Sequence, residues 1–556
     1  MEAKQPAAPS RTDRWDPAAS PVGFVVWAVV FTLAYTLLPV FAENQHTKCL
    51  AGLARAGMGF LARDWLAGTT DPFPLFTTLV EWTYRATGTR GFYLWPVLLF
   101  GAYLAGCSLL ARALLGDRRA AEVRLPFLAA VVVSHSALLR LAAESWTGFD
   151  VGWAVQSGVA YQYILGPVLQ PAMFGVLLVL GLGLAGVGRP APALAAFALA
   201  ALAHPAYLVV AAILGVGVAV ADGLERRRFR PALALAVVVA AAALSVAALG
   251  ASRLGPTSAA AWKLATQAQL YLRMPHHTLP RVFFNAQEAV KLLWMLLGLA
   301  LVGRHRVAAP LLLLGGAAAV ASAAAVVTGS EALELAQPWR VVAVLVPVAT
   351  AVLLARAMAW LGDGECRLKA LRGAALAAVA AAVVGGGVLQ SHALARRAAD
   401  PAQGVFAWVR DNVRAGDLYL VPVAIPAPRC ALPASLAAGV REALQWRGAA
   451  RDLEGFRLGT GAPALVTFKS NPIRDVEVAE WLRRLELAAR FYDPASPAAG
   501  ETLGELVARY GVTHVVIPRG GRALPPGVEI VYQDAEYVVG RVTQAAGGGA
   551  PAATAR

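Results

Sequence analysis

Apolar runs long enough to cross a bilayer recur along most of this chain. A helix needs about 20 residues to cross roughly 30 Å of hydrocarbon. The candidate spans are 22–42, 91–115, 125–142, 164–187, 191–203, 206–221, 231–250, 286–302, 307–327, 341–359 and 373–390. Of the 556 residues, 58% are hydrophobic and 15% are charged, whereas soluble domains carry about 25% charged residues. The sequence therefore predicts an α-helical polytopic membrane protein with about eleven transmembrane helices.

Two of these candidate spans, 191–203 and 206–221, are short. They flank His204-Pro205, so we expect a helix pair that enters from the cytoplasmic side and turns within the bilayer. Other helices would shield the backbone groups exposed at the turn.

The distribution of basic residues predicts the orientation of the chain. With the N-terminus in the cytoplasm, five short inner loops hold thirteen Lys and Arg, and the short outer loops hold five. We therefore expect a multi-pass protein of the inner (plasma) membrane with a disordered cytoplasmic tail at 1–21. Topology explains most of the net charge of +15, so we expect no nucleic-acid partner. On the outer side the positive charge is concentrated at 253–291, where five bases accompany only Glu288.

Soluble patterning replaces the apolar runs from residue 391. Helices are predicted at 404–414, 476–489 and 501–510, and strands at 417–423, 513–518 and 530–542. This alternation predicts an extracytoplasmic α/β domain over 391–543, after a transmembrane domain at 22–390 that contains a long first outer loop at 43–90. The Ala/Gly-rich residues 544–556 are predicted to be a disordered tail.

The long first outer loop contains two candidate catalytic acids. Glu43 follows the first span directly, and Asp64 lies about twenty residues later. Outward-facing acids of this kind suit a general base or a metal–phosphate site. Alternatively, Glu43 caps the next helix and Asp64 pairs with Arg63 or Arg55.

Further outer residues could contact a sugar or an acceptor, namely His46, Trp146, Asp150, Tyr161 and Gln162. Aromatic rings can stack on a sugar, and carboxylates and amides can bind its hydroxyl groups. Anchoring at the membrane interface explains the aromatic residues equally well.

A third group could bind a phosphate. Arg273 offers a bidentate fork, and His276-His277 lie between two prolines that fix the backbone. Adjacent histidines in an extended segment point in different directions, so one of them is expected to bind the ligand rather than both sharing a metal. Arg340 either holds a lipid phosphate or extends its side chain to the interface.

The soluble domain adds Lys469 and Arg474 among small polar residues. They are typical of an anion or acceptor surface, and also of a solvated face.

Taken together, this arrangement resembles the GT-C superfamily of integral membrane glycosyltransferases. The resemblance rests on the many spans, the long first outer loop with Glu43 at its start, the short helix pair and the C-terminal soluble domain. It implies a polyprenyl-phosphate-linked sugar donor and a glycan, lipid or protein acceptor on the outer face. It also implies Glu43 and Asp64 as the catalytic acids, and Arg273, His276, His277 and Arg340 as the groups that bind the lipid phosphate.

Some members of that superfamily use a divalent metal such as Mg²⁺ or Mn²⁺. In this chain Asn44 follows Glu43, where many members have a second acid, so the metal is left unknown. The competing function is a non-catalytic membrane protein, either a transporter or an assembly partner in envelope-glycan synthesis. Transporters often show internal repeats, and none is evident in this sequence.

Overall fold

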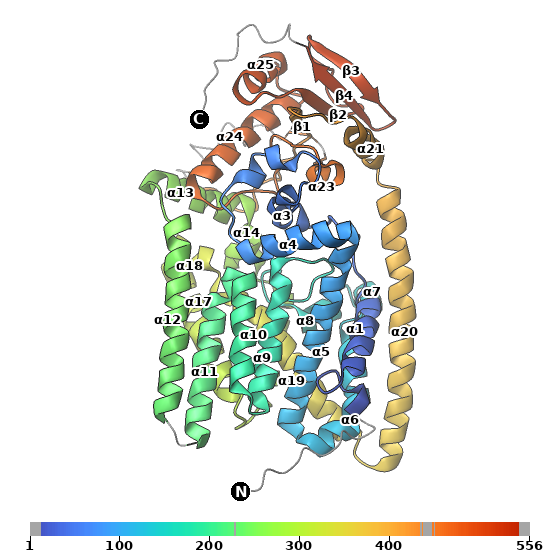
Figure 1. Cartoon of the computed structure of the whole chain (residues 1–556), viewed down its shortest axis with the longest axis vertical. Coiled ribbons are helices and arrows are strands. Elements are labelled where there is room, and N and C mark those ends of the chain that lie inside the picture. The colour runs from blue at the N-terminus through green and yellow to red at the C-terminus, as the bar shows by residue number, and fades with distance from the viewer. Residues whose placement is uncertain (1–12, 227–228, 434–435, 437–447, 450, 544–556) are drawn as a thin grey trace. The chain divides into compact units, whose positions relative to one another are not determined.

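The computed structural model describes residues 13–226, 229–433, 436, 448–449 and 451–543. The chain forms two compact units (Figure 1). The first contains the chain up to Leu38, Arg90–Leu249 and His276–Leu394, and the second contains Pro39–Thr89, Gly250–Pro275 and the chain from Ala395. Residues 1–12 of the tail predicted at 1–21, and the whole tail predicted at 544–556, lie outside the described residues.

The first unit consists mainly of helices, and each predicted span overlaps at least one of them. The longer helices are α1 (Pro21–Tyr35), α5 (Leu94–Leu115), α6 (Asp117–Ser134), α7 (Ala137–Thr147), α9 (Val176–Gly186), α10 (Pro190–Ala203), α11 (Leu208–Arg226), α12 (Phe229–Leu254), α16 (Ala286–Ala300), α17 (Ala308–Thr328), α19 (Val342–Leu361) and α20 (Glu365–Ala398). By length and composition, five helical stretches of the described residues can cross a membrane, or six if the bent pair α6 and α7 counts as one. The polytopic helical fold is confirmed, and the number of eleven spans stays a prediction.

Two predicted spans differ from the helices observed. The helical stretch Pro205–Glu225 has 21 residues and is long enough to cross a membrane, so the prediction of a short second helix at 206–221 is wrong. The helix continues past residue 221 through Asp222, Gly223, Leu224 and Glu225 to Arg226. The span predicted at 125–142 is broken between α6 and α7, which bend by 57°. Ser136 is the N-cap residue at which α7 begins, and its side chain accepts a hydrogen bond from the Leu139 amide.

The tail predicted to be disordered at 1–21 is folded from residue 13 onward, so that prediction is wrong for this part. Asp16 is buried, lies 3.2 Å from the Arg124 guanidinium and accepts a 2.9 Å hydrogen bond from Ser108. Trp27 donates its indole N–H to the Trp15 carbonyl at 3.0 Å. These contacts hold the segment against the unit's own helices.

The second unit carries a four-stranded sheet in the order β1-β2-β4-β3. Its strands are β1 (Tyr419–Leu420), β2 (His514–Pro518), β3 (Val528–Gln533) and β4 (Tyr537–Val542). β1 pairs with β2 in parallel, and β4 pairs with β2 and β3 in antiparallel orientation. The strand predicted at 530–542 is thus a hairpin, and the one predicted at 417–423 is shorter than expected.

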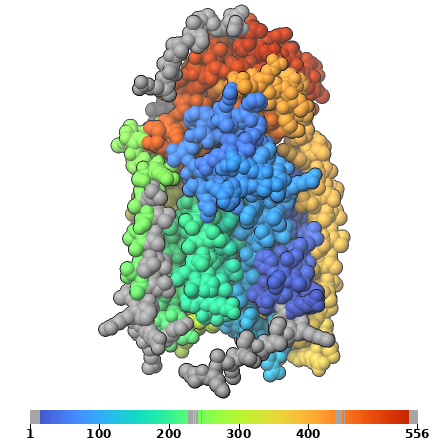
Figure 2. Space-filling model, viewed as in Figure 1, coloured from blue at the N-terminus to red at the C-terminus, as the bar shows by residue number. Residues whose placement is uncertain are grey.

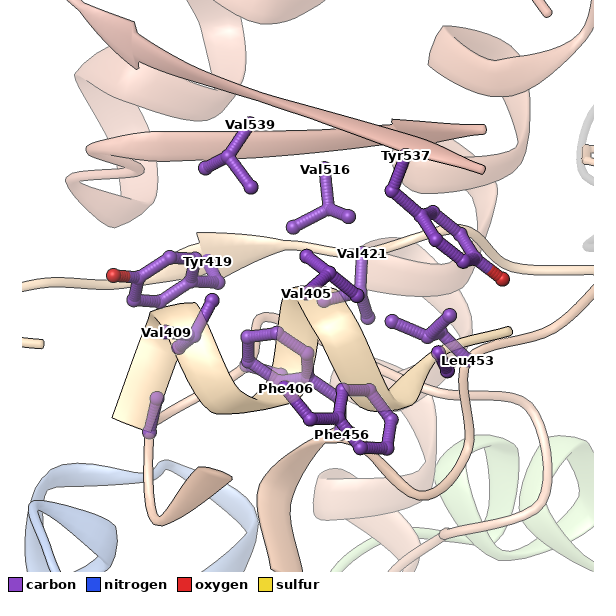
Figure 3. Packing of buried hydrophobic residues seen from close by; sticks show 13 residues of the cluster. Val405, Phe406, Val409, Tyr419, Val421, Leu453, Phe456, Val516, Tyr537 and Val539 are labelled. Carbon is purple, nitrogen blue, oxygen red and sulfur yellow. The ribbon is translucent and has the colours of Figure 1, made fainter. Parts of the chain in front are cut away.

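Helices α21 (Gln403–Asn412), α23 (Phe456–Thr460), α24 (Asp475–Tyr492) and α25 (Ala499–Tyr510) complete the C-terminal part of this unit. α21 directs Val405, Phe406 and Val409 towards Tyr419 and Val516 of the sheet (Figure 3). Fully burying a side chain such as Val or Phe stabilises a fold by about 1.5–3 kcal/mol. The predicted α/β domain is therefore observed, with its core under the sheet.

The predicted first outer loop belongs almost wholly to this second unit, whereas the sequence assigned 43–90 to the transmembrane domain. It folds into α2 (Gln45–Lys48), α3 (Leu50–Arg55) and α4 (Pro74–Thr87). In the space-filling view its blue residues lie directly against the orange C-terminal residues (Figure 2). Gly59 and Gly461 pack backbone to backbone, and the Phe60 amide donates to the Gly461 carbonyl at 2.7 Å. The loop and the C-terminal segment are therefore one folded body.

Candidate functional site

A strained turn at residues 157–163 is the centre of the candidate site in the first unit. Ser157 and Tyr163 form an antiparallel bridge, and the Gly158 amide donates to the Gln162 carbonyl at 2.8 Å. Ala160 and Tyr161 both have φ of 57°, a left-handed conformation that turns of this kind usually give to Asn or Gly. A non-glycine residue held there costs on the order of 1–3 kcal/mol. Such strain persists only where the surrounding structure enforces it.

The turn brings together three residues that the sequence singled out. Tyr161 has a side chain that is 48% exposed, and its ring meets His276 edge to face with centroids 6.1 Å apart. His277 donates its Nδ1–H to the Ala160 carbonyl at 2.6 Å, which fixes the tautomer because a carbonyl can only accept. The two imidazole rings lie 4.1 Å apart, in different orientations.

Gln162 continues this site to Arg340 through a second strained residue. Its side-chain amide lies 3.2 Å from Gln337 Oε1, which accepts a 2.5 Å hydrogen bond from Arg340 Nη2. Gln337 also has a positive φ, of 53°. Arg340 Nε is buried without a hydrogen-bond partner, and within the described part of the chain no carboxylate pairs with this guanidinium. A buried cation without a counter-charge is costly, so this position favours an anionic ligand.

Trp146 and Asp150 have other surroundings in the first unit. Trp146 is 86% exposed near the end of α7. Asp150 caps the short helix α8 (Val151–Gln156) by accepting from the Trp153 amide at 2.7 Å, and it lies 3.2 Å from Arg140. These contacts give Asp150 a structural role, and the sugar contact predicted for both residues stays a prediction.

Glu43 lies in an irregular segment of the second unit. The helix α1 ends at Tyr35, so the span predicted to reach residue 42 is too long. Thr36, Phe41 and Glu43 have φ of 71°, 64° and 49°. Asn44, directly after Glu43, is the N-cap residue of α2. All non-glycine residues with positive φ in the described ranges thus lie either in the segment 36–43 or around Tyr161 and Gln337.

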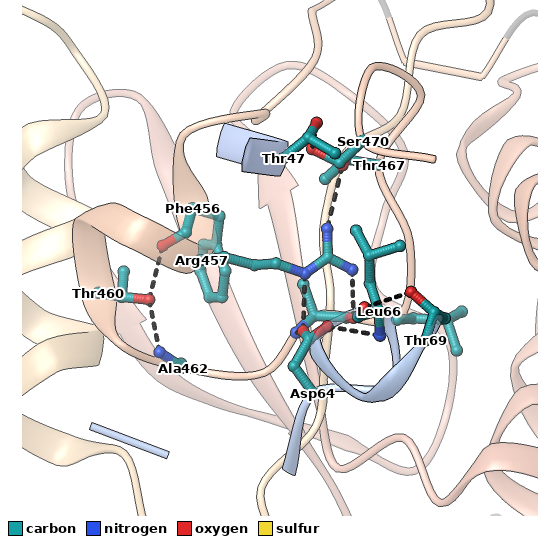
Figure 4. A network of polar contacts seen from close by, with 12 residues as sticks. Thr47, Asp64, Leu66, Thr69, Phe456, Arg457, Thr460, Ala462, Thr467 and Ser470 are labelled. Carbon is teal, nitrogen blue, oxygen red and sulfur yellow. Dashed lines mark hydrogen bonds and ion pairs between the residues drawn. The ribbon is translucent and has the colours of Figure 1, made fainter. Parts of the chain in front are cut away.

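Asp64 lies at the centre of a buried network (Figure 4). Arg457 donates to its Oδ2 at 2.7 Å, the Ala464 amide to the same oxygen at 2.9 Å, and the Leu66 amide to Oδ1 at 2.9 Å. Its side chain has no exposed surface. A general base must reach the proton that it removes, so the position of Asp64 does not support the predicted catalytic role. Its partner is Arg457, rather than Arg63 or Arg55.

Arg273 donates from two of its guanidinium nitrogens within the second unit. Nε donates to the Lys469 carbonyl and to Asn471 Oδ1, each at 3.1 Å, and Nη2 donates to the Lys469 carbonyl at 2.6 Å. Burial lowers the pKa of Arg273. These bonds use Nε and one N–H of Nη2 and hold the loop that carries Lys469. The phosphate contact predicted for Arg273 stays a prediction.

The predicted acceptor residues of this unit have distinct environments. His46 is 8% exposed, its Nδ1 has no hydrogen-bond partner, and its pKa falls to about 4 because of burial and the nearby positive charge of Lys469, Arg397 and Arg457. Lys469 Nζ lies 3.6 Å from Glu454. Arg474 precedes α24, and its Nε is buried without a partner. His46 is therefore neutral near pH 7.

A small hollow of about 50 Å³ lies between the first outer loop and the segment 471–473. Thr47, Lys48, Asp71, Phe73 and Asn471 are among its lining residues, and Lys48 Nζ lies 4.4 Å from the Phe73 ring centroid. Sequence reasoning missed this hollow as a site, although the run Thr70-Asp71-Pro72-Phe73 is the local signal that could have indicated it. Hydroxyl, amide and aromatic groups together suit part of a sugar.

The described residues do not form a metal site. No group of three or more His, Cys, Asp or Glu within them could hold a metal ion. The Mg²⁺ or Mn²⁺ that the family resemblance raised stays a prediction.

No protein-family model and no curated protein matches this chain. Among solved structures, the crystal structure of ArnT from Cupriavidus metallidurans bound to undecaprenyl phosphate is similar, with a TM-score of 0.41 and 14% sequence identity. The similarity covers 95% of this chain and 99% of that chain.

Proposed function

We propose that the first unit binds the phosphate of a polyprenyl-phosphate-linked sugar, and that the chain transfers this sugar to a glycan, lipid or protein acceptor outside the cytoplasm. The observation that carries the proposal is the guanidinium of Arg340, which has a buried, unpartnered Nε and no carboxylate partner among the described residues. Arg suits phosphate because its planar donors match the phosphate oxygens.

The surroundings of Arg340 favour a phosphate that is attached to a lipid. Arg340 lies just before α19, within the apolar stretch Glu331–Leu361, which is long enough to cross a membrane. The Gln162 amide is joined to Arg340 through Gln337, and the preceding residue Tyr161 has a half-exposed ring against His276, a combination that suits a sugar. Strained residues such as Ala160 and Gln337 cluster at ligand sites, which is consistent with this assignment.

The proposed reaction keeps Glu43 as the general base. The acceptor hydroxyl loses its proton to the Glu43 carboxylate as its oxygen bonds to the anomeric carbon, and the bond from that carbon to the phosphate oxygen breaks. The polyprenyl phosphate leaves as an anion with the bonding electron pair. Arg340 and one of His276 and His277 stabilise its charge. The buried Asp64 takes no part in this scheme.

Binding of undecaprenyl phosphate to the purified chain tests the proposal. Arg340→Ala should weaken binding about tenfold or more, because a hydrogen bond to a charged group contributes about 1.5–3 kcal/mol. Arg356→Ala is the matched control, since Arg356 lies on the following helix α19 and makes only a 3.5 Å bond to a carbonyl. Undecaprenol, which lacks the phosphate, should not bind. Unchanged binding in Arg340→Ala, or equal binding of undecaprenol, would contradict the proposal.

A second measurement separates catalysis from binding. Glycan transfer in membranes should be lost in Glu43→Gln and retained in Glu81→Gln, because Glu81 only pairs with Arg85 on α4. Full glycan transfer in Glu43→Gln would contradict the assignment of Glu43 as the general base. Lipid binding without any transfer would favour the transporter or assembly partner instead.

A further inference from the structure

A buried ion pair lies behind the strained turn of the first unit. Lys291 and Glu288 are 1% and 3% exposed, and Lys291 Nζ lies 3.1 Å and 3.2 Å from the two Glu288 oxygens. Both residues belong to the largely apolar helix α16. Charged residues are costly in such a helix and are retained there mostly for function. The scheme proposed above gives this pair no role.

The third bond of the ammonium explains the position of Lys291. Nζ donates to the Gly158 carbonyl at 3.1 Å, at the start of the strained turn. Glu288 offsets the charge, so Lys291 can present a strong donor to a backbone carbonyl inside the protein. Asp150 is also close enough to interact electrostatically with Lys291.

Two other contacts hold the same turn. His277 donates to the Ala160 carbonyl, and Gly158 lies so close to α19 that a Cβ there would be 2.3 Å from the Ala343 amide nitrogen. The turn is thus fixed from α16, from the His276-His277 segment and from α19. Of these contacts, only the Lys291 bond requires a buried charge.

We propose that Lys291, neutralised by Glu288, is a positioning residue that holds the turn 157–163 in its left-handed conformation and so presents Tyr161 and Gln162 to the ligand. This inference rests on the proposed function for the identity of the ligand, a polyprenyl phosphate, but the clamping of the turn does not. Without the clamp Ala160 and Tyr161 relax towards ordinary backbone angles, and the binding-competent fraction of molecules falls.

The test uses the full-length double variant Glu288→Gln/Lys291→Met, which removes both charges and leaves no buried charge unpaired. Hydrogen exchange of the Gly158 and Gln162 amides should accelerate about tenfold or more, since their bonds close the turn. Affinity for undecaprenyl phosphate should fall about tenfold if the fraction of molecules with the turn in its binding-competent conformation falls to about a tenth. The matched control is Glu365→Gln/Lys369→Met, an exposed pair on α20 with a 2.8 Å contact, which should change neither quantity.

A rescue variant distinguishes positioning from general stability. Glycine adopts positive φ without steric cost, so Ala160→Gly added to the double variant should restore affinity to within about threefold of the wild type. Unchanged amide exchange in the double variant would overturn the clamp, and so would a loss of affinity that Ala160→Gly leaves unchanged. Accelerated exchange with unchanged affinity would support the clamp and contradict the proposed ligand site.

The single variant Ala160→Gly keeps the test decisive if the double variant does not fold. In the wild-type background it should raise thermal stability and leave lipid affinity unchanged, because it relieves strain that the clamp otherwise opposes. Lower stability would overturn the proposal.

Discussion

The charge state of His46 follows from where its ring lies. The side chain is almost fully buried, and Lys469, Arg397 and Arg457 add positive potential, so the pKa of His46 is about 4 instead of 6.5. Between these two pH values the unfolded chain binds a proton that the folded chain does not. The free energy of unfolding therefore decreases as pH falls from about 6.5 to about 4, and His46 contributes no pH dependence above that range.

This linkage predicts a pH-dependent difference between the wild type and His46→Gln. Between pH 7 and pH 5 the wild type should lose about 2 kcal/mol more stability than the variant, because glutamine does not titrate. Apparent melting temperatures of both proteins at the two pH values measure the difference. Parallel losses in the two proteins would contradict the neutral, buried state of His46.

Residue types were easier to predict than residue partners. The composition of the outer loops and the prolines around His276-His277 were enough to select five residues, Tyr161, Gln162, His276, His277 and Arg340. The structure connects them through the turn 157–163 and through Gln337. The left-handed backbone of Ala160 and Tyr161 was not predictable, since neither residue type favours it. The contacts that enforce it come from Lys291 and His277, which are distant in the sequence.

At the scale of elements, the contact of α20 with α1 depends on one glycine. A Cβ added to Gly386 would lie 2.0 Å from the Leu33 carbonyl oxygen and 3.0 Å from Ala34 Cα. Thr36 donates its hydroxyl to the Gly386 carbonyl at 3.1 Å. The next residue, Gly387, has no neighbour within 4 Å of such a Cβ. The two helices approach this closely because Gly386 has no side chain.

Adjacent glycines therefore give a matched pair of variants. Gly386→Ala should destabilise the first unit by about 1–3 kcal/mol through overpacking, whereas Gly387→Ala should be neutral or stabilise the helix by up to about 1 kcal/mol. Apparent melting temperatures in detergent compare them directly. Equal shifts in both variants would show that α20 does not pack on α1 through Gly386.

Helix positions were predictable because long apolar runs have few other solutions, but helix ends were not. The end of α1 at Tyr35 and the break between α6 and α7 depend on Thr36 and Ser136, single residues inside otherwise apolar sequence. The continuation of α11 to Arg226 has the opposite cause, because charged residues can prolong a helix beyond its apolar part.

At the scale of the whole molecule, the second unit is assembled from three separate segments of the chain. Asp64 and Arg457 are 393 residues apart and form a 2.7 Å contact, and Thr70 donates to Glu477 at 2.9 Å. Thr257 in the middle segment donates to Asp475 at 2.8 Å. The sequence indicated a continuous domain from residue 391 because local periodicity cannot reveal partners in distant segments. Residues 395–543 alone would leave Arg457 buried without its counter-charge.

The contribution of this contact can be measured by an isosteric change. Asp64→Asn keeps an acceptor for the Leu66 amide but leaves the Arg457 guanidinium, 3% exposed, without a carboxylate. Breaking a buried pair on one side costs about 3–5 kcal/mol. Glu505→Gln is the control, since the Arg490–Glu505 pair is 28% and 44% exposed and should contribute about 1 kcal/mol or less. The second unit should melt at a lower temperature in Asp64→Asn only, and protease should then cleave both the loop 39–89 and the C-terminal segment. Cleavage of the loop alone would show that the C-terminal segment folds without it.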